Sequence, residues 1–125
     1  MQKTRIMIVD DSRTFRRGMR ALLDIQPDLQ VVAEAHDGPA AIQLIDDLQP
    51  DLVLLDAQMP GMSGVELTQL AKSRWPQVKI ILMTMYADYR SRSIEAGVDA
   101  FVTKGIPPEH LLSLIRGIVQ GESYG

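Results

Sequence analysis

Short, continuous apolar runs alternate along the chain with longer segments in which apolar residues recur every three or four positions. The runs lie at about 5–9, 30–35, 51–55, 79–83 and 99–103, and they are rich in Val, Ile and Leu. Such runs predict strands that are buried on both faces of a sheet. Because strands and helical segments alternate strictly, the pattern predicts an α/β fold, with a parallel sheet, right-handed crossovers and helices on both faces.

Three of the intervening segments and the segment after the last run carry helix signals. In the first segment the apolar residues share one helical face. The second and last helices open with proline in the first turn, where proline is tolerated, and the third opens with the spacing of a capping box. These signals are Phe15, Met19, Leu22 and Leu23; Gly38-Pro39; Ser63 with Glu66; and Pro107-Pro108-Glu109. The fourth helix, about 87–96, has little apolar face and is predicted mainly from its place between two strands.

The last helix has an unusually wide apolar face. Its apolar residues cover roughly 160° of the circumference, whereas an ordinary core-facing stripe covers about 100°. They are Leu111, Leu112, Leu114, Ile115, Ile118 and Val119. Deeper burial is the favoured reading, and contact of part of the face with a partner is the alternative.

Composition narrows the class of protein. A chain of 125 residues fits one domain with a real core. Its net charge of −3 gives no general attraction to nucleic acid. The absence of cysteine excludes disulfides and thiolate metal sites. No run has the length of a membrane span, and the N-terminus enters the first strand with no room for a signal peptide. We therefore expect a cytoplasmic protein.

Three carboxylates follow two of the apolar runs. Asp10 and Asp11 come after the first strand, and Asp56 comes after Leu52–Leu55 in the third. The carboxyl ends of such strands are where open α/β sheets bind ligands. Three negative charges gathered there are unfavourable unless a cation joins them. The arrangement therefore predicts a metal site, and carboxylate oxygens suit Mg²⁺.

Two more polar residues end neighbouring strands. Thr84 follows the fourth strand and Lys104 follows the fifth. Lys104 and a divalent cation together neutralise the three carboxylates, and both can counter the charge of a phosphoryl group. Asp56 could be the nucleophile, because carboxylates form aspartyl phosphates. Thr84 would then donate a hydrogen bond to a phosphoryl oxygen.

The segments that carry these residues resemble the four signatures of response-regulator receiver domains, in the family's order and spacing. They are Val9-Asp10-Asp11-Ser12, Leu54-Leu55-Asp56 with Ala57-Gln58-Met59-Pro60-Gly61, Leu82-Met83-Thr84, and Phe101-Val102-Thr103-Lys104. The resemblance implies a flavodoxin-like (βα)5 doubly wound sandwich with strand order 2-1-3-4-5. It also implies that Asp56 accepts a phosphoryl group from a phosphohistidine on a sensor histidine kinase or phosphotransfer protein.

The resemblance assigns further roles around the acceptor. Asp11 and Asp56 would ligate Mg²⁺ together with the backbone carbonyl of Gln58, and Asp10 would act largely through water. Thr84 and Phe101 would form a switch pair that reshapes the surface of the fourth helix, fifth strand and fifth helix. Phosphorylation of Asp56 would be a local change of charge that shifts the balance between two conformations of that surface.

These features predict a signalling module that is not an enzyme in the ordinary sense, since it catalyses only its own phosphotransfer and dephosphorylation. Residues 1–121 would form the receiver domain, and 122–125 a tail or the start of a linker. Asp37-Gly38 and Ala96-Gly97 resemble the subclass attached to a C-terminal helix-turn-helix domain, so we expect a longer regulator that controls transcription. We expect neither direct nucleic-acid binding by this chain nor membrane contact, and a phosphorylation-dependent homodimer is plausible.

Three alternatives stay open. The chain could be a stand-alone single-domain regulator that acts through protein contacts. It could be a small-molecule phosphatase with an aspartyl-phosphate intermediate, although the βα units leave no room for a substrate cap. It could also be a receiver-like binding module that is never phosphorylated, against which the intact set of five polar residues argues.

Two further features lie beside these residues in the sequence. Arg13, Arg16, Arg17 and Arg20 form a basic stretch on the first helix, which we expect to be mainly a solvated face. Met85 follows Thr84, and a bulky side chain there could slow the access of water or small phosphodonors.

Overall fold

A five-stranded parallel sheet forms the middle of the computed structural model, which describes residues 2–86 and 90–121. The strands lie in the order β2-β1-β3-β4-β5, as the resemblance to receiver domains implied. They are β1 (Thr4–Val9), β2 (Leu29–Ala35), β3 (Leu52–Asp56), β4 (Lys79–Thr84) and β5 (Ala100–Thr103). All neighbouring strands pair in parallel. This is the doubly wound flavodoxin-like arrangement.

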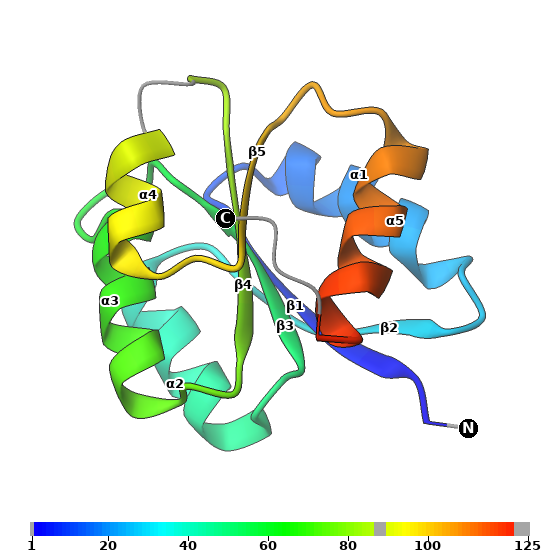
Figure 1. Ribbon diagram of the computed structural model, residues 1–125, viewed down its shortest axis with the longest axis horizontal. Helices are drawn as coiled ribbons and strands as arrows, with labels where there is room; N and C mark the ends of the chain where they lie inside the picture. Colours follow the sequence, from blue (N-terminus) through cyan, green and yellow to red (C-terminus); the bar gives the residue numbers. More distant parts are fainter. Residues whose placement is uncertain (1, 87–89, 122–125) are drawn as a thin grey trace.

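Helices cover both faces of the sheet (Figure 1). On one side lie α1 (Arg13–Asp24) and α5 (Pro108–Val119). On the other lie α2 (Gly38–Leu48), α3 (Gly64–Arg74) and α4 (Arg90–Ala96). The predicted start of the fourth helix, 87–89, lies outside the described residues.

Alternate residues of each strand point into two separate cores, because successive side chains of a strand face opposite ways. Ile8, Leu54 and Val102 belong to the core under α1 and α5. Val9, Leu55 and Leu82 belong to the core under α2, α3 and α4. Positions 10, 56 and 104 continue the first series, so their side chains are directed toward α1 and α5. Positions 84 and 101 continue the second.

Side-chain caps fix the starts of α1, α2 and α3. Ser12 accepts a hydrogen bond from the backbone N–H of Phe15 at the start of α1, and Asp37 accepts one from Ala40 at the start of α2. The predicted capping box of α3 is confirmed, with Ser63 and Glu66 each bonded to the other's backbone N–H. Within the described chain, every helix falls short of the length and apolar content that crossing a membrane requires.

Burial accounts for much of the wide apolar face of α5. Leu111, Ile115 and Ile118 are fully buried, while Leu112, Leu114 and Val119 are half-buried at the edge of the same core. Arg116 holds the helix to the chain that precedes β2, with Nε 2.8 Å from Asp28 Oδ2 and Nη2 2.9 Å from Asp28 Oδ1. The guanidinium lowers the pKa of the Asp28 carboxyl below its ordinary value.

Candidate functional site

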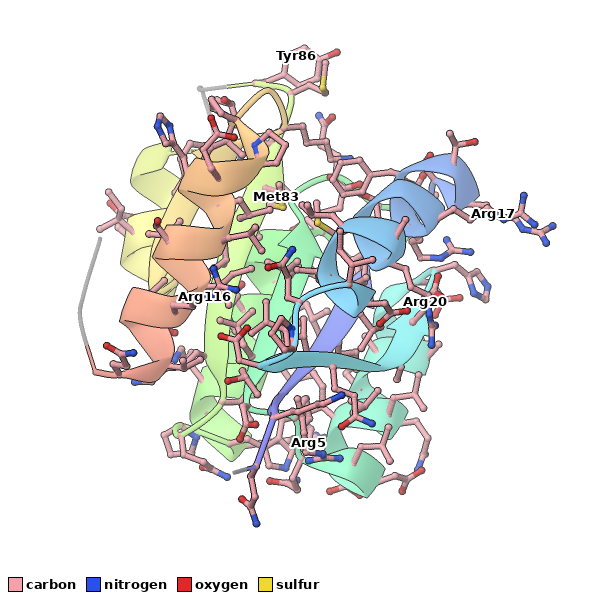
Figure 2. All side chains as sticks on the ribbon, turned by 90° about the vertical axis from the view of Figure 1, so that its right-hand side faces the viewer. Arg5, Arg17, Arg20, Met83, Tyr86 and Arg116 are labelled. Atoms are coloured by element: carbon pink, nitrogen blue, oxygen red, sulfur yellow. The ribbon has the colours of Figure 1, made fainter. Side chains whose placement is uncertain are left out.

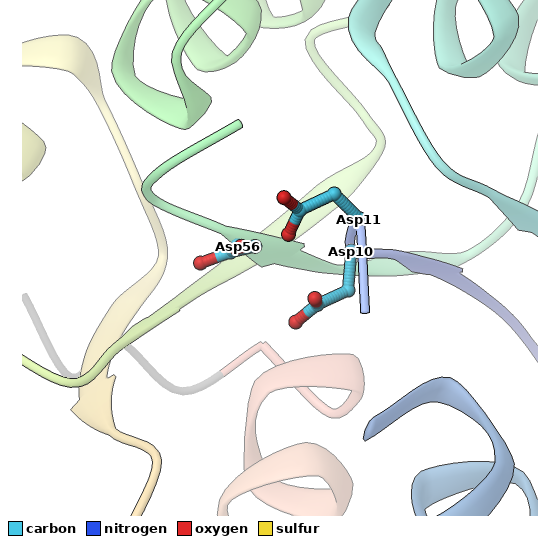
Figure 3. Close-up of side chains that lie close together, drawn as sticks. All are labelled: Asp10, Asp11 and Asp56. Carbon is cyan, nitrogen blue, oxygen red and sulfur yellow. The ribbon is translucent and has the colours of Figure 1, made fainter. Parts of the chain in front are cut away.

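Three carboxylates meet at the carboxyl edge of the sheet. Asp10 and Asp11 follow β1, and Asp56 is the last residue of β3 (Figure 3). One oxygen from each lies within 4.8 Å of the others. Asp10 and Asp56 are buried, whereas Asp11 is exposed. The parallel pairing of β1 with β3 brings the two strand ends side by side.

Lys104 lies across this cluster from the end of β5. Its Nζ is 2.7 Å from Asp10 Oδ2 and 3.5 Å from Asp56 Oδ1, and its side chain is only 14% exposed. One ammonium therefore neutralises part of the charge of two buried carboxylates.

Backbone N–H groups orient both buried carboxylates. The N–H of Ser12 donates to Asp10 Oδ1 at 2.8 Å, and the N–H of Gln58 donates to Asp56 Oδ1 at 3.2 Å. These local turns hold each carboxylate over the edge of the sheet rather than letting it turn into solvent.

Burial raises the pKa of Asp56 to about 6, and the negative charge of Asp10 adds to the effect. The N–H of Gln58 and the ammonium of Lys104 act in the opposite direction, while Asp11 raises the pKa slightly further. A nearby cation stabilises the charged form of a carboxylate and so lowers its pKa. A cation bound beside Asp56 would therefore oppose the effects of burial and of Asp10 on its pKa.

Thr84 ends β4, which pairs with β3, and is buried. Its Oγ1 accepts a hydrogen bond of 3.1 Å from the backbone N–H of Tyr86. The N–H of Ala57 donates to the carbonyl of Met83 at 2.9 Å, which ties the chain after Asp56 to the end of β4. Phe101 is half-buried against the core under α2, α3 and α4. Met85 is 70% exposed.

A hollow of about 400 Å³ opens beside Asp11. Gln58, Met59 and Ser63 line it together with Asp11. Beside it, carboxylate oxygens of Asp10, Asp11 and Asp56 lie within 4.8 Å of one another, and such oxygens are the hard ligands that Mg²⁺ prefers. The donor set and its net negative charge therefore fit a divalent cation.

Two contacts that support the site were not predicted from the sequence. Arg16 donates from Nη1 to the backbone carbonyl of Asp10 at 2.6 Å and pairs with Glu34 at 3.1 Å. Its side chain is 15% exposed, so the basic stretch is not a uniformly solvated face. Arg20 also pairs with Glu34, whereas Arg17 points away from α1 into solvent (Figure 2). The Arg16–Glu34 pair joins α1 to β2, and the same arginine holds the backbone of Asp10.

Gly64 is the second unpredicted support. Its N–H donates to the carbonyl of Ala57 at 2.9 Å. A Cβ at this position would lie 2.3 Å from the carbonyl oxygen of Asp56 and 2.8 Å from Ala57 Cα. Only glycine therefore lets α3 begin this close to the end of β3.

Residues 6–116 match the family model described as the response regulator receiver domain. This chain belongs to that family. A receiver domain is a phosphorylation-dependent signalling switch and not an enzyme of metabolism, which agrees with the expectation from the sequence.

Known relatives place this receiver domain among two-component regulators. It is 32% identical to the transcriptional regulatory protein DegU of Brevibacillus brevis, over 98% of this chain and 52% of that protein. It is 36% identical to the oxygen regulatory protein NreC of Staphylococcus epidermidis, over 96% of this chain and 56% of that protein. The chain thus spans about half the length of these curated relatives.

The solved structure of a LuxR-family two-component response regulator from Aurantimonas sp. SI85-9A1 superposes on this receiver domain with a TM-score of 0.93. The two are 33% identical, and the match covers 99% of this chain and 90% of that one. The predicted resemblance to the subclass of receivers attached to a C-terminal helix-turn-helix domain is therefore confirmed by the similarity to LuxR-family regulators.

Proposed function

We propose that Asp56 accepts a phosphoryl group from a phosphohistidine on a sensor histidine kinase or phosphotransfer protein, in a reaction that requires Mg²⁺. The observation that carries this proposal is the convergence of a buried Asp56 with Lys104, 3.5 Å away, and with Asp11 and Asp10. Phosphoryl transfer needs mainly positioning and charge neutralisation, which these groups supply.

The contacts favour Asp56 over Asp10 as acceptor. Asp10 is bonded on Oδ1 by the N–H of Ser12 and on Oδ2 by Lys104. The described contacts of Asp56 fall on Oδ1 alone, from Gln58 N–H and Lys104. Oδ2 of Asp56 can therefore form the new P–O bond while the P–N bond to the donor histidine breaks and the imidazole leaves with the bonding electron pair.

Asp11, Asp56 and the backbone carbonyl of Gln58 would hold the Mg²⁺ ion, with Asp10 acting through water. The ion would supply positive charge to the phosphoryl oxygens. Lys104 would exchange its bond to Asp10 for one to a phosphoryl oxygen. Thr84 Oγ1 accepts the hydrogen bond from Tyr86 through a lone pair, and the hydroxyl can donate its own proton to another phosphoryl oxygen.

Thr84 would couple the new charge to the surface, with Phe101 as the second switch residue. The N–H of Tyr86 donates to the Thr84 hydroxyl, so movement of Thr84 toward Asp56 would shift or release the chain after β4. Phe101 is half-buried and can turn further inward when Thr84 vacates its place. The surface of α4, β5 and α5 would then differ between the two states.

The similarity to known regulators supports proposals about the whole protein. We infer that residues 1–121 form the receiver domain, with 122–125, which lie outside the described residues, as a tail or linker. The relative named a transcriptional regulatory protein supports control of transcription by a longer protein. A phosphorylation-dependent homodimer remains part of the proposal. This chain would contact neither nucleic acid nor membrane directly, and the cytoplasm is the proposed compartment.

Beryllofluoride, a phosphoryl mimic, tests the switch. We expect it to shift backbone amide resonances at Asp56, Thr84 and the α4–β5–α5 surface only when Mg²⁺ is present, and not at all in Asp56→Asn. Shifts confined to the acidic cluster would contradict the switch. Steady turnover of unrelated phosphate esters would instead favour the small-molecule phosphatase.

A further inference from the structure

The Lys104 ammonium has a third partner besides the two carboxylates. It lies 4.3 Å from the centre of the Phe15 ring. An ammonium over an aromatic face is attracted by the negative charge of the ring face, and the attraction is stronger where water is partly excluded. Lys104 meets that condition, since its side chain is 14% exposed.

Phe15 is itself held firmly. It lies in the first turn of α1, where its backbone N–H donates to the Ser12 cap at 3.2 Å. Its ring packs on the core under α1 and α5. After Phe15 the helix is anchored by the bond from Arg16 to the Asp10 carbonyl and by the buried Met19 and Leu23. The ring is therefore a fixed partner for a flexible side chain.

Phe15 and Lys104 also share a boundary with an apolar cleft between α1 and α5, of about 320 Å³. Met19 and Met83 line the same cleft. In Figure 2 Met83 lies between the two helices. The ring thus covers the side of the ammonium that faces apolar side chains, and the carboxylates take the other side.

The reaction requires Lys104 to change partners. Its shortest contact, 2.7 Å to Asp10, must give way to a contact with the transferred phosphoryl group. A lysine on four methylenes has many rotamers, and an ammonium that leaves its carboxylate can move out into water. The face of Phe15, already 4.3 Å from the ammonium, is a partner that does not have to be given up when Asp10 is.

We propose that Phe15 is a positioning residue for phosphoryl transfer, whose ring holds the Lys104 ammonium over Asp56 through a cation–π contact while Lys104 exchanges Asp10 for a phosphoryl oxygen. The proposal rests on the role proposed above for Lys104. It does not depend on any binding partner, so it applies to a small phosphodonor as well as to a phosphohistidine.

Conservative substitutions test the ring itself. Phe15→Leu keeps an apolar side chain but removes the aromatic face, and Phe15→Tyr keeps the face. With acetyl phosphate and saturating Mg²⁺, we expect phosphorylation of Phe15→Leu to be about three- to tenfold slower, the size of one partly desolvated cation–π contact. Phe15→Tyr should be phosphorylated at about the wild-type rate. Met19→Leu, on the same cleft, should change it less than about twofold.

Two readouts separate positioning from loss of packing. The affinity for Mg²⁺ should stay within about twofold of wild type in Phe15→Leu, because its proposed ligands do not touch the ring. The ε-methylene protons of Lys104 should show an upfield ring-current shift in the wild type and in Phe15→Tyr, and lose it in Phe15→Leu. A fall in rate without that change in shift would overturn the proposal.

A double-mutant cycle closes the test. In a Lys104→Met background, Phe15→Leu should cause no further loss of rate, because the cation is gone. An equal loss in both backgrounds would show that Phe15 acts by packing alone, and an unchanged rate for Phe15→Leu in the Lys104 background would show that it does not act at all. If Lys104→Met itself left the rate unchanged, the proposed role of Lys104 would fail instead.

Discussion

The Asp56 carboxylate is harder to ionise in the folded protein than in the unfolded chain. Its pKa is raised from 3.8 to about 6, first by burial and then by Asp10. A carboxyl whose folded pKa lies above its unfolded value destabilises the fold once it is ionised. The cost is absent below about pH 4, grows as the pH rises through the interval between the two values, and is complete above about pH 6.

We therefore expect Asp56→Asn to be more stable than wild type without Mg²⁺ near pH 7.5, by about 1–2 kcal/mol after allowing for solvent screening. The difference should vanish as the pH falls to about 4. Urea denaturation at a series of pH values measures it. A stability difference that stays constant across this range would contradict the assignment.

Lys104 contributes the positive charge of the cluster. Lys104→Met should lower the free energy of unfolding by about 2–3 kcal/mol, because the buried Asp10 loses its 2.7 Å partner. The same change should strengthen Mg²⁺ binding about three- to tenfold, since the cation meets one positive charge fewer. Urea denaturation measures the loss of stability, and titration calorimetry measures the gain in Mg²⁺ affinity. Lys3→Met, at an exposed lysine, is the control for both. Weaker Mg²⁺ binding would contradict the electrostatic account.

At the residue scale, sequence reasoning located the groups that end strands. Asp10, Asp11, Asp56, Thr84 and Lys104 could be placed at one edge because parallel strands with alternating helices bring their carboxyl ends together. The roles assigned to them stay predictions. The contacts that Phe15, Arg16 and Gly64 make at the site were not predicted, because they depend on how α1 and α3 pack against distant strands. A half-buried aromatic or an arginine on a helix has no local pattern that reveals its partner.

At the scale of elements, the start of α3 packs closely against the backbone at the end of β3. Gly64→Ala would place a Cβ against the main chain of Asp56 and Ala57, which cannot give way as a side chain can. We expect a loss of at least about 2 kcal/mol of stability together with weaker Mg²⁺ binding, because Asp56 and Gln58 must shift.

Gly18→Ala is the matched control. Gly18 lies within α1, is exposed, and a Cβ there would meet nothing within 4 Å. Alanine should therefore leave Mg²⁺ binding unchanged and stabilise the helix by about 0.5–1 kcal/mol. Thermal unfolding and Mg²⁺ titration of both variants provide the comparison. Equal effects of the two substitutions would show that the close approach at Gly64 has no importance for the site.

Strand boundaries were predicted to within about one residue, because each buried strand is a continuous apolar run with polar residues on either side. β2 begins at Leu29 and β3 ends at Asp56, each one residue beyond the run predicted from the sequence. The fourth helix was the weakest prediction, since Arg92, Ile94 and Glu95 are exposed and leave little apolar pattern. Its described part, Arg90–Ala96, is held to the fold through buried Ser93 and Ala96.

At the scale of the whole molecule, exposed apolar groups lie beside the proposed switch. Tyr86 is 55% exposed and Ile94 is 42% exposed, and both lie in the final third of the chain. With beryllofluoride and Mg²⁺ we expect dimers in sedimentation velocity, and Ile94→Glu should prevent them without unfolding the domain. A sedimentation coefficient unaffected by beryllofluoride would count against phosphorylation-dependent dimerisation.

The central claim is that Asp56 is the phosphoryl acceptor in a Mg²⁺-dependent reaction. Intact-mass spectrometry after incubation with acetyl phosphate tests it most directly, followed by reductive trapping of the acyl phosphate and peptide mapping. We predict a gain of one phosphoryl group that requires Mg²⁺, is released by hydroxylamine, maps to Asp56 and is absent from Asp56→Asn. Modification of Asp10 or Asp11 instead, or persistence in Asp56→Asn, would contradict the account.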